Sequence, residues 1–532
     1  MTEAAVRSGF WQALTGAAAT AALIGLAARM QAPWHVLAPV ALAPWLVGME
    51  AASVAAALGS AVLLAMGMTA LAFPWLPGAI EAYARAPDAV AWTASLVAAP
   101  ILLEPQLIAA CACRLIARKL GSRPFAAAVT VLAYVGAEWA LPRLFGDTFG
   151  TALYPSETLR QAADLAGVRG LTLICLVVSE CAAAAVLSIG WRMRAAAALG
   201  GLCLVGAAAL YGGLRLRYIE ARTRGAPTFS AGIVQAAITG YDKLAAEQGT
   251  YGAVRQIVDA HLELSQQLFA SGPLDLLVWP ETVYPTTFGA PKSEDGAAFD
   301  REITAVSVQT GTPLVFGAFE ESAAGEHNAA FFLDPSERPV AVDSYRKSLL
   351  FPMTEHVPTW LDSRWLRDAL PWTGHWESGP GPKAVRVQLR DGIVVRLAPL
   401  ICYEALYSGY VAAAVRSGAA AILTLSNDAW FPNDAAPRLH LLSAAFRSIE
   451  LRVPQIRVTN SGISALILPS GALVAATRFG ERAAVRFDVP RMGRTWTLVL
   501  VWGDWLGPTA LALTALLLGG RLILLLGSAV RR

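Results

Sequence analysis

The sequence is poor in charged residues. Only 15% of its 532 residues are Asp, Glu, Lys or Arg, whereas 55% are hydrophobic, and the mean hydropathy is +0.49. Soluble domains carry about 25% charged residues, so this composition favours a membrane protein. The few charges nearly cancel, with a net charge of +3, and no long basic or acidic run occurs. A nucleic-acid-binding surface is therefore excluded.

Cysteine is scarce outside the apolar segments. Five cysteines lie in segments that are expected to be apolar helices, where a thiol behaves as a small hydrophobic group: Cys111, Cys113, Cys175, Cys181 and Cys203. Cys402 stands alone in the more polar part of the chain, without a cysteine partner there for a disulfide or a zinc site. We therefore expect Cys402 to be a free thiol. Because motifs for nucleotides and metals are also lacking, we expect no cofactor and no metal.

Apolar residues crowd two regions of the chain, and the stretch between them has a mixed composition. A bilayer core about 30 Å thick requires roughly 20 residues of helix. We predict a polytopic α-helical membrane domain over residues 1–220 with about seven transmembrane helices. A domain of mixed composition follows over 225–495, and a C-terminal transmembrane helix is expected within 498–532. The expected spans are 11–29, 33–49, 51–73, 89–110, 124–141, 168–190, 196–214 and 504–527.

Basic residues in short loops predict the orientation of the chain, because such loops face the cytoplasm. They follow the fourth and sixth expected spans and end the chain: Arg114, Arg118, Lys119, Arg123, Arg192, Arg194, Arg531 and Arg532. One further crossing then places residues 225–495 on the other side of the membrane. We expect a multi-pass membrane protein with an extracytoplasmic domain. If the protein lies in the inner membrane of a Gram-negative bacterium, this domain is periplasmic.

Three glutamates fall within or beside the expected spans: Glu104, Glu138 and Glu180. An ionisable group inside a membrane is costly and often functional. Each could equally lie near a helix end or pair with a neighbour such as Arg169. The sequence leaves these two interpretations open.

Between residues 225 and 490 the sequence alternates β-rich runs with helical ones. This pattern predicts α/β architecture in which helices cover sheets. The expected strands are 232–235, 274–279, 313–319, 329–333, 339–345, 385–389, 393–400, 420–425, 455–458, 464–468 and 473–477. The expected helices are 248–271, 293–310, 404–417 and 434–451.

Three short segments each place one reactive group directly after a β-rich run: Glu281, Lys347 and Cys402. A thiol with a pKa of about 8.5 is mostly protonated at neutral pH, so a nucleophilic cysteine needs a base or a nearby cation. Glu281 could take the proton, and Lys347 could stabilise the thiolate or an oxyanion formed by attack on a carbonyl. Taken singly, each residue has an ordinary interpretation as a buried thiol, a turn or a solvated basic group.

The order and context of the three residues resemble the nitrilase superfamily. The matching segments are Val278-Trp279-Pro280-Glu281, Tyr345-Arg346-Lys347 and Ile401-Cys402-Tyr403-Glu404. This resemblance implies a four-layer α-β-β-α sandwich. It also implies Glu281 as the base, Lys347 as its companion and Cys402 as the nucleophile.

Within that superfamily the chain resembles the apolipoprotein N-acyltransferase family. The segments that carry this resemblance are Asn328, Leu350 to Pro358, Ser426 to Phe431, Arg447, Glu450, Arg457, Asn460, Gly462 and Gly503-Asp504-Trp505. The resemblance implies transfer of an acyl chain from a phospholipid donor, through a thioester on the cysteine, to the N-terminal amine of an apolipoprotein that carries a diacylglyceryl-cysteine.

The same resemblance implies three supporting residues. Glu355 would lie beside Lys347 as a second carboxylate and assist it or the incoming amine. Tyr403 and Glu404 follow the nucleophile, where backbone amides could hold an oxyanion. Glu404 could instead be a carboxylate in the first turn of a helix, where the helix dipole favours it.

The chain departs from the family pattern at three places. Gln235-Ala236-Ala237-Ile238 replaces Gln-Gly-Asn-Ile, Tyr241 is the nearest aromatic to a family tryptophan, and Met353-Thr354 replaces Phe-Gly. These departures lie in segments where the resemblance implies contact with the substrates. They therefore put the identity of the acyl acceptor in doubt. A membrane-anchored amidase or nitrilase-type hydrolase, or an acyltransferase with another amine acceptor, fits the same three residues. An inactive domain in a transporter or scaffold predicts loss of one of them.

Residues 359–376 hold four tryptophans: Trp360, Trp365, Trp372 and Trp376. Tryptophan favours the membrane interface, and apolar residues here recur at helical spacing, so the segment could lie on that interface. Ordinary packing in the protein core is the alternative.

Overall fold

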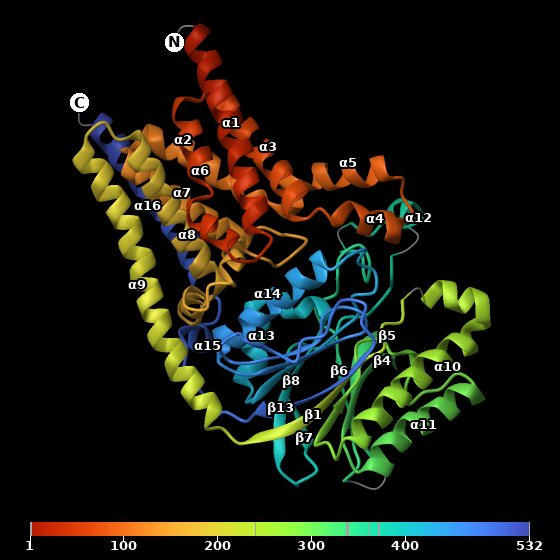
Figure 1. Cartoon of the computed structure of the whole chain (residues 1–532). Coiled ribbons are helices and arrows are strands. Elements are labelled where there is room, and N and C mark those ends of the chain that lie inside the picture. Colours follow the sequence, from red (N-terminus) through yellow and green to blue (C-terminus); the bar gives the residue numbers. More distant parts are fainter. Residues whose placement is uncertain (1–2, 240, 337–339, 360, 371–372, 531–532) are drawn as a thin grey trace. The chain divides into compact units, whose positions relative to one another are not determined.

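The computed structural model describes residues 3–239, 241–336, 340–359, 361–370 and 373–530 (Figure 1). The chain forms two compact units. Residues 1–77, 86–217 and 504–532 make up the first, and residues 78–85 and 218–503 make up the second. The first unit is helical, whereas the second contains all the described strands. The segment 78–85 was not expected to belong with the strands.

The helices from the N-terminus to the start of the strands are α1 (Glu3–Ala27), η1 (Trp34–Val40), α2 (Ala43–Gly48), η2 (Met49–Ala51), α3 (Val54–Ala72), α4 (Leu76–Ala84), α5 (Asp88–Ala98), η3 (Ala99–Leu103), α6 (Pro105–Leu120), α7 (Arg123–Ala140), η4 (Phe149–Leu153), η5 (Leu159–Ala162), α8 (Ala163–Leu187) and α9 (Trp191–Arg224). The last helix, α16, is Leu506–Val530. Among the described residues, five helices are long and apolar enough to cross a membrane, or six if the pair 88–103 and 105–120, bent by 54°, counts as one span.

The expected span at 33–49 is wrong, because this stretch is broken into η1, α2 and η2. Pro39 lies inside η1 and Pro44 lies in the first turn of α2. Proline lacks a backbone N–H and cannot continue a helical ladder. None of the three pieces approaches the roughly 20 residues that a span requires.

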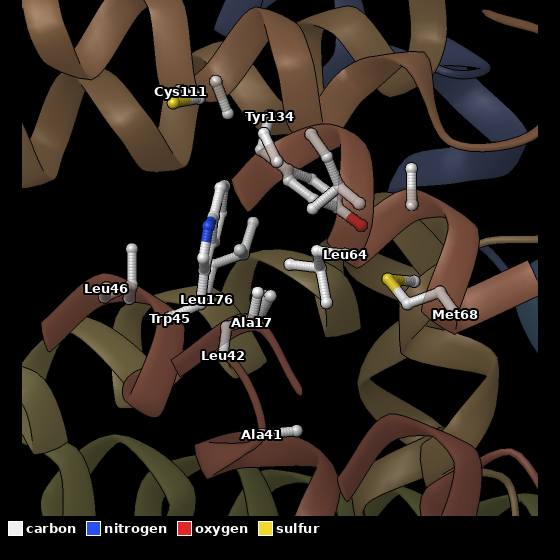
Figure 2. Close-up of a cluster of buried hydrophobic side chains, with 14 of the residues drawn as sticks. Ala17, Ala41, Leu42, Trp45, Leu46, Leu64, Met68, Cys111, Tyr134 and Leu176 are labelled. Carbon is white, nitrogen blue, oxygen red and sulfur yellow. The ribbon is translucent and has the colours of Figure 1, made fainter. Parts of the chain in front are cut away.

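A cluster of buried apolar side chains holds the first unit together (Figure 2). The cluster includes Trp45 of α2, Leu64 of α3, Tyr134 of α7 and Leu176 of α8. The helix backbones approach closely at several glycines, of which Gly16 is an example. A Cβ on Gly16 would lie 2.5 Å from the carbonyl oxygen of Pro44, so only glycine lets α1 pack this closely against α2.

Several ionisable residues of the first unit form ion pairs. Arg114, which is 4% exposed within α6, contacts Glu180 at 2.6 Å and Glu50 at 3.1 Å. Arg114 was expected in a loop, and its burial in a helix removes it from the orientation argument.

The other two glutamates of the expected spans also have polar neighbours. Glu138 lies 3.8 Å from Nε of Arg169, the partner that the sequence suggested, and Arg169 also pairs with Asp504. Glu104 accepts a hydrogen bond from Gln106 at 2.6 Å. The pairing interpretation therefore holds for Glu138 and Glu180.

The second unit is built on two sheets. The first has the order β13-β1-β2-β4-β5-β6, with β3 beside β4, and the second has the order β12-β11-β10-β9-β8-β7. The strands of the first sheet are β1 (Thr228–Gln235), β2 (Leu276–Val278), β3 (Tyr284–Thr287), β4 (Leu314–Ser322), β5 (Gly325–Asp334), β6 (Ala341–Arg346) and β13 (Ala483–Pro490). Those of the second are β7 (Val385–Gln388), β8 (Val394–Ile401), β9 (Ala421–Ser426), β10 (Gln455–Thr459), β11 (Ala465–Ile467) and β12 (Leu473–Val474).

The helices of this unit are α10 (Tyr241–Ala270), α11 (Glu294–Thr310), α12 (Arg364–Ala369), η6 (Cys402–Leu406), α13 (Ser408–Arg416), α14 (Ala435–Leu451) and α15 (Leu498–Trp502). Alternating side chains on the strands separate the layers, because successive residues point to opposite faces of a sheet. Val315 of β4 packs between the sheets with Leu423 of β9, whereas its neighbour Phe316 packs with α10 and α11. Ile422 packs on the other side, with α13 and α14. The predicted α-β-β-α sandwich is confirmed.

The structure adds two strands that were not expected, β3 and β13. β13 pairs antiparallel with β1 along its whole length, from Thr228 opposite Pro490 to Gln235 opposite Ala483. Alternating apolar residues in β13 carried a signal that was missed. The expected helix at 404–417 is divided into η6 and α13, and α10 starts earlier than expected.

Replacing Arg114 by alanine tests the buried charges of the first unit. The change leaves Glu180 without its partner, and Glu50 keeps only contacts to the more exposed Arg118 and Arg123. Breaking a buried ion pair costs about 3–5 kcal/mol, so we expect a clearly lower thermal midpoint in detergent. Arg192→Ala, at an exposed position of α9, is the control and should keep the wild-type midpoint. An unchanged midpoint for Arg114→Ala would contradict the prediction.

Candidate functional site

The ends of three strands position the three reactive residues. Glu281 follows β2 by way of Trp279-Pro280, Lys347 directly follows β6, and Cys402 directly follows β8. β2 and β6 belong to one sheet, and β8 belongs to the other. The structure brings the residues together, because Nζ of Lys347 lies 3.4 Å from Glu281 Oε1 and both charges influence the pKa of Cys402.

The carboxylate of Glu281 is held from two sides. The side chain of Asn328 donates to Oε1 at 2.7 Å, and the backbone N–H of Asn427 donates to Oε2 at 2.8 Å. Burial raises the pKa of the Glu281 carboxyl, and Glu355 adds to this effect, whereas Lys347 opposes it. A fixed carboxylate with a raised pKa is suited to accept a proton.

Lys347 is 1% exposed and lies between two carboxylates. Its Nζ contacts Glu355 Oε1 at 2.6 Å in addition to Glu281. Burial by itself would lower the pKa of Lys347, but the charges of Glu355 and Glu281 raise it overall. Lys347 therefore remains an ammonium and can stabilise negative charge. Glu355 is itself held by the backbone N–H of Phe351 at 2.7 Å.

Cys402 begins the short helix η6 with φ of 51°, in the left-handed region that few residues other than glycine adopt. Such a conformation costs roughly 1–3 kcal/mol and persists only where neighbouring structure imposes it. Burial raises the pKa of the Cys402 thiol to about 12, the Glu281 charge adds to this, and Lys347 opposes it. The resting thiol is thus protonated and must lose its proton as it attacks.

Glu404 lies beside Cys402 and is fully buried. One of its oxygens accepts the backbone N–H of Ser348 at 2.7 Å. The other accepts the backbone N–H of Ile401 at 2.8 Å and the hydroxyl of Tyr345 at 2.7 Å. The carboxylate therefore ties the segment after Lys347 to the turn that carries Cys402. This connection differs from the ordinary helix-dipole role of a first-turn carboxylate.

Tyr403 packs in a group of aromatic side chains next to the reactive residues. Its ring lies 5.0 Å from that of Phe351 and 5.0 Å from that of Tyr407, and Phe351 also contacts Trp430 at 6.2 Å. The side chain of Tyr403 thus forms part of an apolar wall.

Sequence reasoning missed His440 of α14. Its Nε2 lies 3.1 Å from the carbonyl oxygen of Cys402, and its Nδ1 lies 3.3 Å from Asp428. No local sequence motif indicates a role for this histidine, because folding alone brings it next to the turn that carries Cys402.

The tryptophan segment divides between two environments. Trp376 packs against Phe319 with ring centroids 4.5 Å apart, whereas Trp365 on α12 is 76% exposed. Trp360 and Trp372 lie outside the described residues. Trp376 therefore packs within the protein, as the alternative interpretation expected. Of the described tryptophans in this segment, Trp365 is the one that could lie on the membrane interface.

Comparisons with known proteins match both parts of the chain. Residues 230–494 match the carbon–nitrogen hydrolase family, and residues 20–181 match the N-terminal domain of apolipoprotein N-acyltransferase. The chain is 26% identical to the apolipoprotein N-acyltransferase of Bdellovibrio bacteriovorus, over 82% of this chain and 81% of that protein. It is 30% identical to that of Caulobacter vibrioides, over 68% of this chain and 64% of that protein. An amidase from Nesterenkonia sp. aligns with 51% of this chain and 92% of its own, with 18% identity and a TM-score of 0.34.

Glu404→Gln tests the connection between the lysine and cysteine segments. The amide places an N–H group against backbone N–H donors, and leaving a buried donor unpaired costs about 1–3 kcal/mol. We expect a lower thermal unfolding midpoint than for the wild-type protein. Glu294→Gln, an exposed first-turn carboxylate of α11, is the matched control and should change the midpoint little. Equal effects of the two changes would reduce Glu404 to an ordinary first-turn carboxylate.

Proposed function

Because this chain belongs to the apolipoprotein N-acyltransferase family, we propose that it moves an acyl chain from a phospholipid to the N-terminal amine of a diacylglyceryl-cysteine apolipoprotein. The observation that supports this most directly is the cluster of Glu281, Lys347 and Cys402 in a chain that also carries membrane-spanning helices. A lipid donor explains why a sandwich of this kind is attached to a membrane part.

In the first half of the reaction, Glu281 takes the proton of the Cys402 thiol as Sγ attacks the ester carbonyl carbon of the phospholipid. The bond between that carbon and the glycerol oxygen breaks, and Glu281 returns the proton to the departing oxygen. A lysophospholipid leaves, and a thioester remains on Cys402. The raised pKa of Glu281 suits it to both proton transfers.

In the second half, the apolipoprotein amine attacks the thioester carbonyl. Glu281 takes the amine proton and gives it to the departing sulfur, so that an amide forms and the free thiol is restored. Both attacks create an oxyanion. The ammonium of Lys347, held in place by Glu355, and the backbone amides that follow Cys402 are the groups that would stabilise it.

The chain is a multi-pass bacterial membrane protein by its family and its apolar helices. For its finer placement, we propose a periplasmic catalytic domain over 225–495, between a membrane domain over 1–220 and a final span within 498–532. Basic residues at the helix ends that flank two connections support this orientation: Arg118, Lys119 and Arg123 beside the connection of α6 and α7, and Arg192 and Arg194 beside that of α8 and α9. Trp365, exposed on α12, supports contact of this segment with the membrane interface.

Acyl transfer can be followed with a phospholipid that carries a labelled acyl chain. We expect label on the purified protein and its transfer to a diacylated lipopeptide added afterwards. Cys402→Ala and Glu281→Gln should abolish labelling. Cys203→Ala, which removes an exposed cysteine of α9, is the matched control and should label normally.

The fate of the label decides between transfer and hydrolysis. Label that ends only as free fatty acid would replace the proposal with a membrane-anchored hydrolase. Transfer to other amines but not to the lipopeptide would indicate another acceptor. Absence of label on the wild-type protein would contradict the acyl-enzyme step.

The pH dependence of acyl-enzyme formation tests the proton path. The base works only when deprotonated, so the rate should rise with pH through the raised pKa of Glu281 and level off far below the thiol pKa of about 12. The measurement is kcat/KM for labelling across pH. An ordinary cysteine has a pKa of about 8.5. A rate that rises only near that pH would show that the thiolate forms without Glu281.

A further inference from the structure

The turn that carries Cys402 is held from behind by His440. The carbonyl oxygen of Cys402 lies 3.1 Å from Nε2 of His440, which belongs to α14 and is nearly buried. The contact joins residues 38 positions apart in sequence. The contact is made to the backbone of Cys402, which is the one of the three reactive residues whose φ lies in the left-handed region.

Behind His440 lies a buried ion pair. Asp428 and Arg457 are both fully buried, and Arg457 lies 3.2 Å from Asp428 Oδ2. The hydroxyl of Ser426 donates to the same carboxylate at 2.9 Å. The backbone of Gly462 packs closely against Asp428, since a Cβ on this glycine would lie 2.0 Å from Asp428 Oδ2. The pair therefore offers His440 a rigid support.

The same segment of chain also holds the base. The backbone N–H of Asn427 donates to Glu281, and the next residue, Asp428, lies 3.3 Å from Nδ1 of His440. Residues 427 and 428 thus connect Glu281 to Cys402 through His440. A shift of His440 would change the distance between base and nucleophile.

The neighbours of His440 also determine where its proton lies. The carbonyl oxygen of Cys402 can only accept, so Nε2 carries the hydrogen that points to it. Nδ1 lies 3.2 Å from Arg457, which can only donate, and 3.3 Å from Asp428 Oδ1, which can only accept. The charges of Asp428 and Arg457 already cancel, and a third buried charge would stand unbalanced. Burial lowers the pKa of His440 and Arg457 lowers it further, in agreement with a neutral ring.

We propose that His440 is a positioning residue for the acyl transfer, which holds the strained Cys402 turn by donating from Nε2 to the Cys402 carbonyl, with Asp428 and Arg457 fixing its ring. This proposal rests on the proposed function for its kinetic consequence. Its structural content is independent of the acceptor. Without this hydrogen bond the Cys402 turn would relax toward an ordinary, negative φ. Sγ of Cys402 would then move away from Glu281.

Two substitutions separate the hydrogen bond from the space that the ring fills. Glutamine places an N–H group near the position of Nε2, whereas asparagine is shorter and reaches only the position of Nδ1. We expect His440→Gln to form acyl-enzyme within about threefold of the wild-type rate. His440→Asn should lower kcat on the order of 10²-fold, as small displacements of reacting groups do, with KM for the phospholipid little changed.

Alkylation of Cys402 by iodoacetamide, followed by mass spectrometry of its peptide, needs no substrate. If the turn moves Sγ away from its base, alkylation should slow about tenfold in His440→Asn and stay near the wild-type rate in His440→Gln. A wild-type protein that is alkylated but transfers no acyl chain would refute the proposed function and leave this test of His440 intact.

His261→Asn is the matched control for loss of a buried histidine. His261 is 1% exposed in α10. Its Nδ1 lies 2.8 Å from the carbonyl oxygen of Ile257 in the same helix, and its ring lies 5.4 Å from that of Trp279. His261→Asn should lower the thermal midpoint as His440→Asn does but leave the alkylation rate of Cys402 unchanged.

If His440→Asn does not fold, His440→Met takes its place, because methionine has the length of glutamine and no hydrogen-bond donor.

Equal slowing in the donor and non-donor variants would show that His440 only fills space, and wild-type rates in both would show that the turn holds itself. Either result overturns the proposal.

Discussion

The buried ammonium of Lys347 is the interaction on which the catalytic unit depends. A cation that is withdrawn from water is tolerated only when opposite charges surround it, and here Glu281 and Glu355 provide them from different segments. The backbone N–H of Lys347 also donates to the carbonyl of Asn328, whose side chain holds Glu281. The charge, the base and the strand ladder are therefore parts of one arrangement, and none can move alone.

This arrangement explains why the cysteine is kept protonated until it reacts. Lys347 is already neutralised by two carboxylates, so it has little left to lower the pKa of the Cys402 thiol. The thiol faces a net negative environment in a buried place. Such a site slows oxidation and alkylation relative to an exposed thiol, because the thiolate is the reactive form. Attack on a bound carbonyl therefore coincides with removal of the thiol proton.

Most of the sandwich could be predicted because short β-rich runs alternate with helical ones along the chain, and because the reactive residues follow three of those runs. The first unit was harder, since an apolar run such as 33–49 satisfies a hydropathy criterion while its prolines interrupt the helix. β13 was missed although it alternates, because a strand far from its partner lacks a local turn signal. His440 could not be found, because only the folded chain brings it to the cysteine turn.

The pairing of β13 with β1 has a consequence for the biogenesis of the protein. β1 is the first strand of the sandwich to be synthesised and β13 is the last, yet they are neighbours along their full length. Contacts between such distant segments form late and leave earlier edges exposed. The ribosome must therefore deliver residue 490 before the sheet can close, so a nascent chain halted earlier displays an open strand edge to the quality-control machinery.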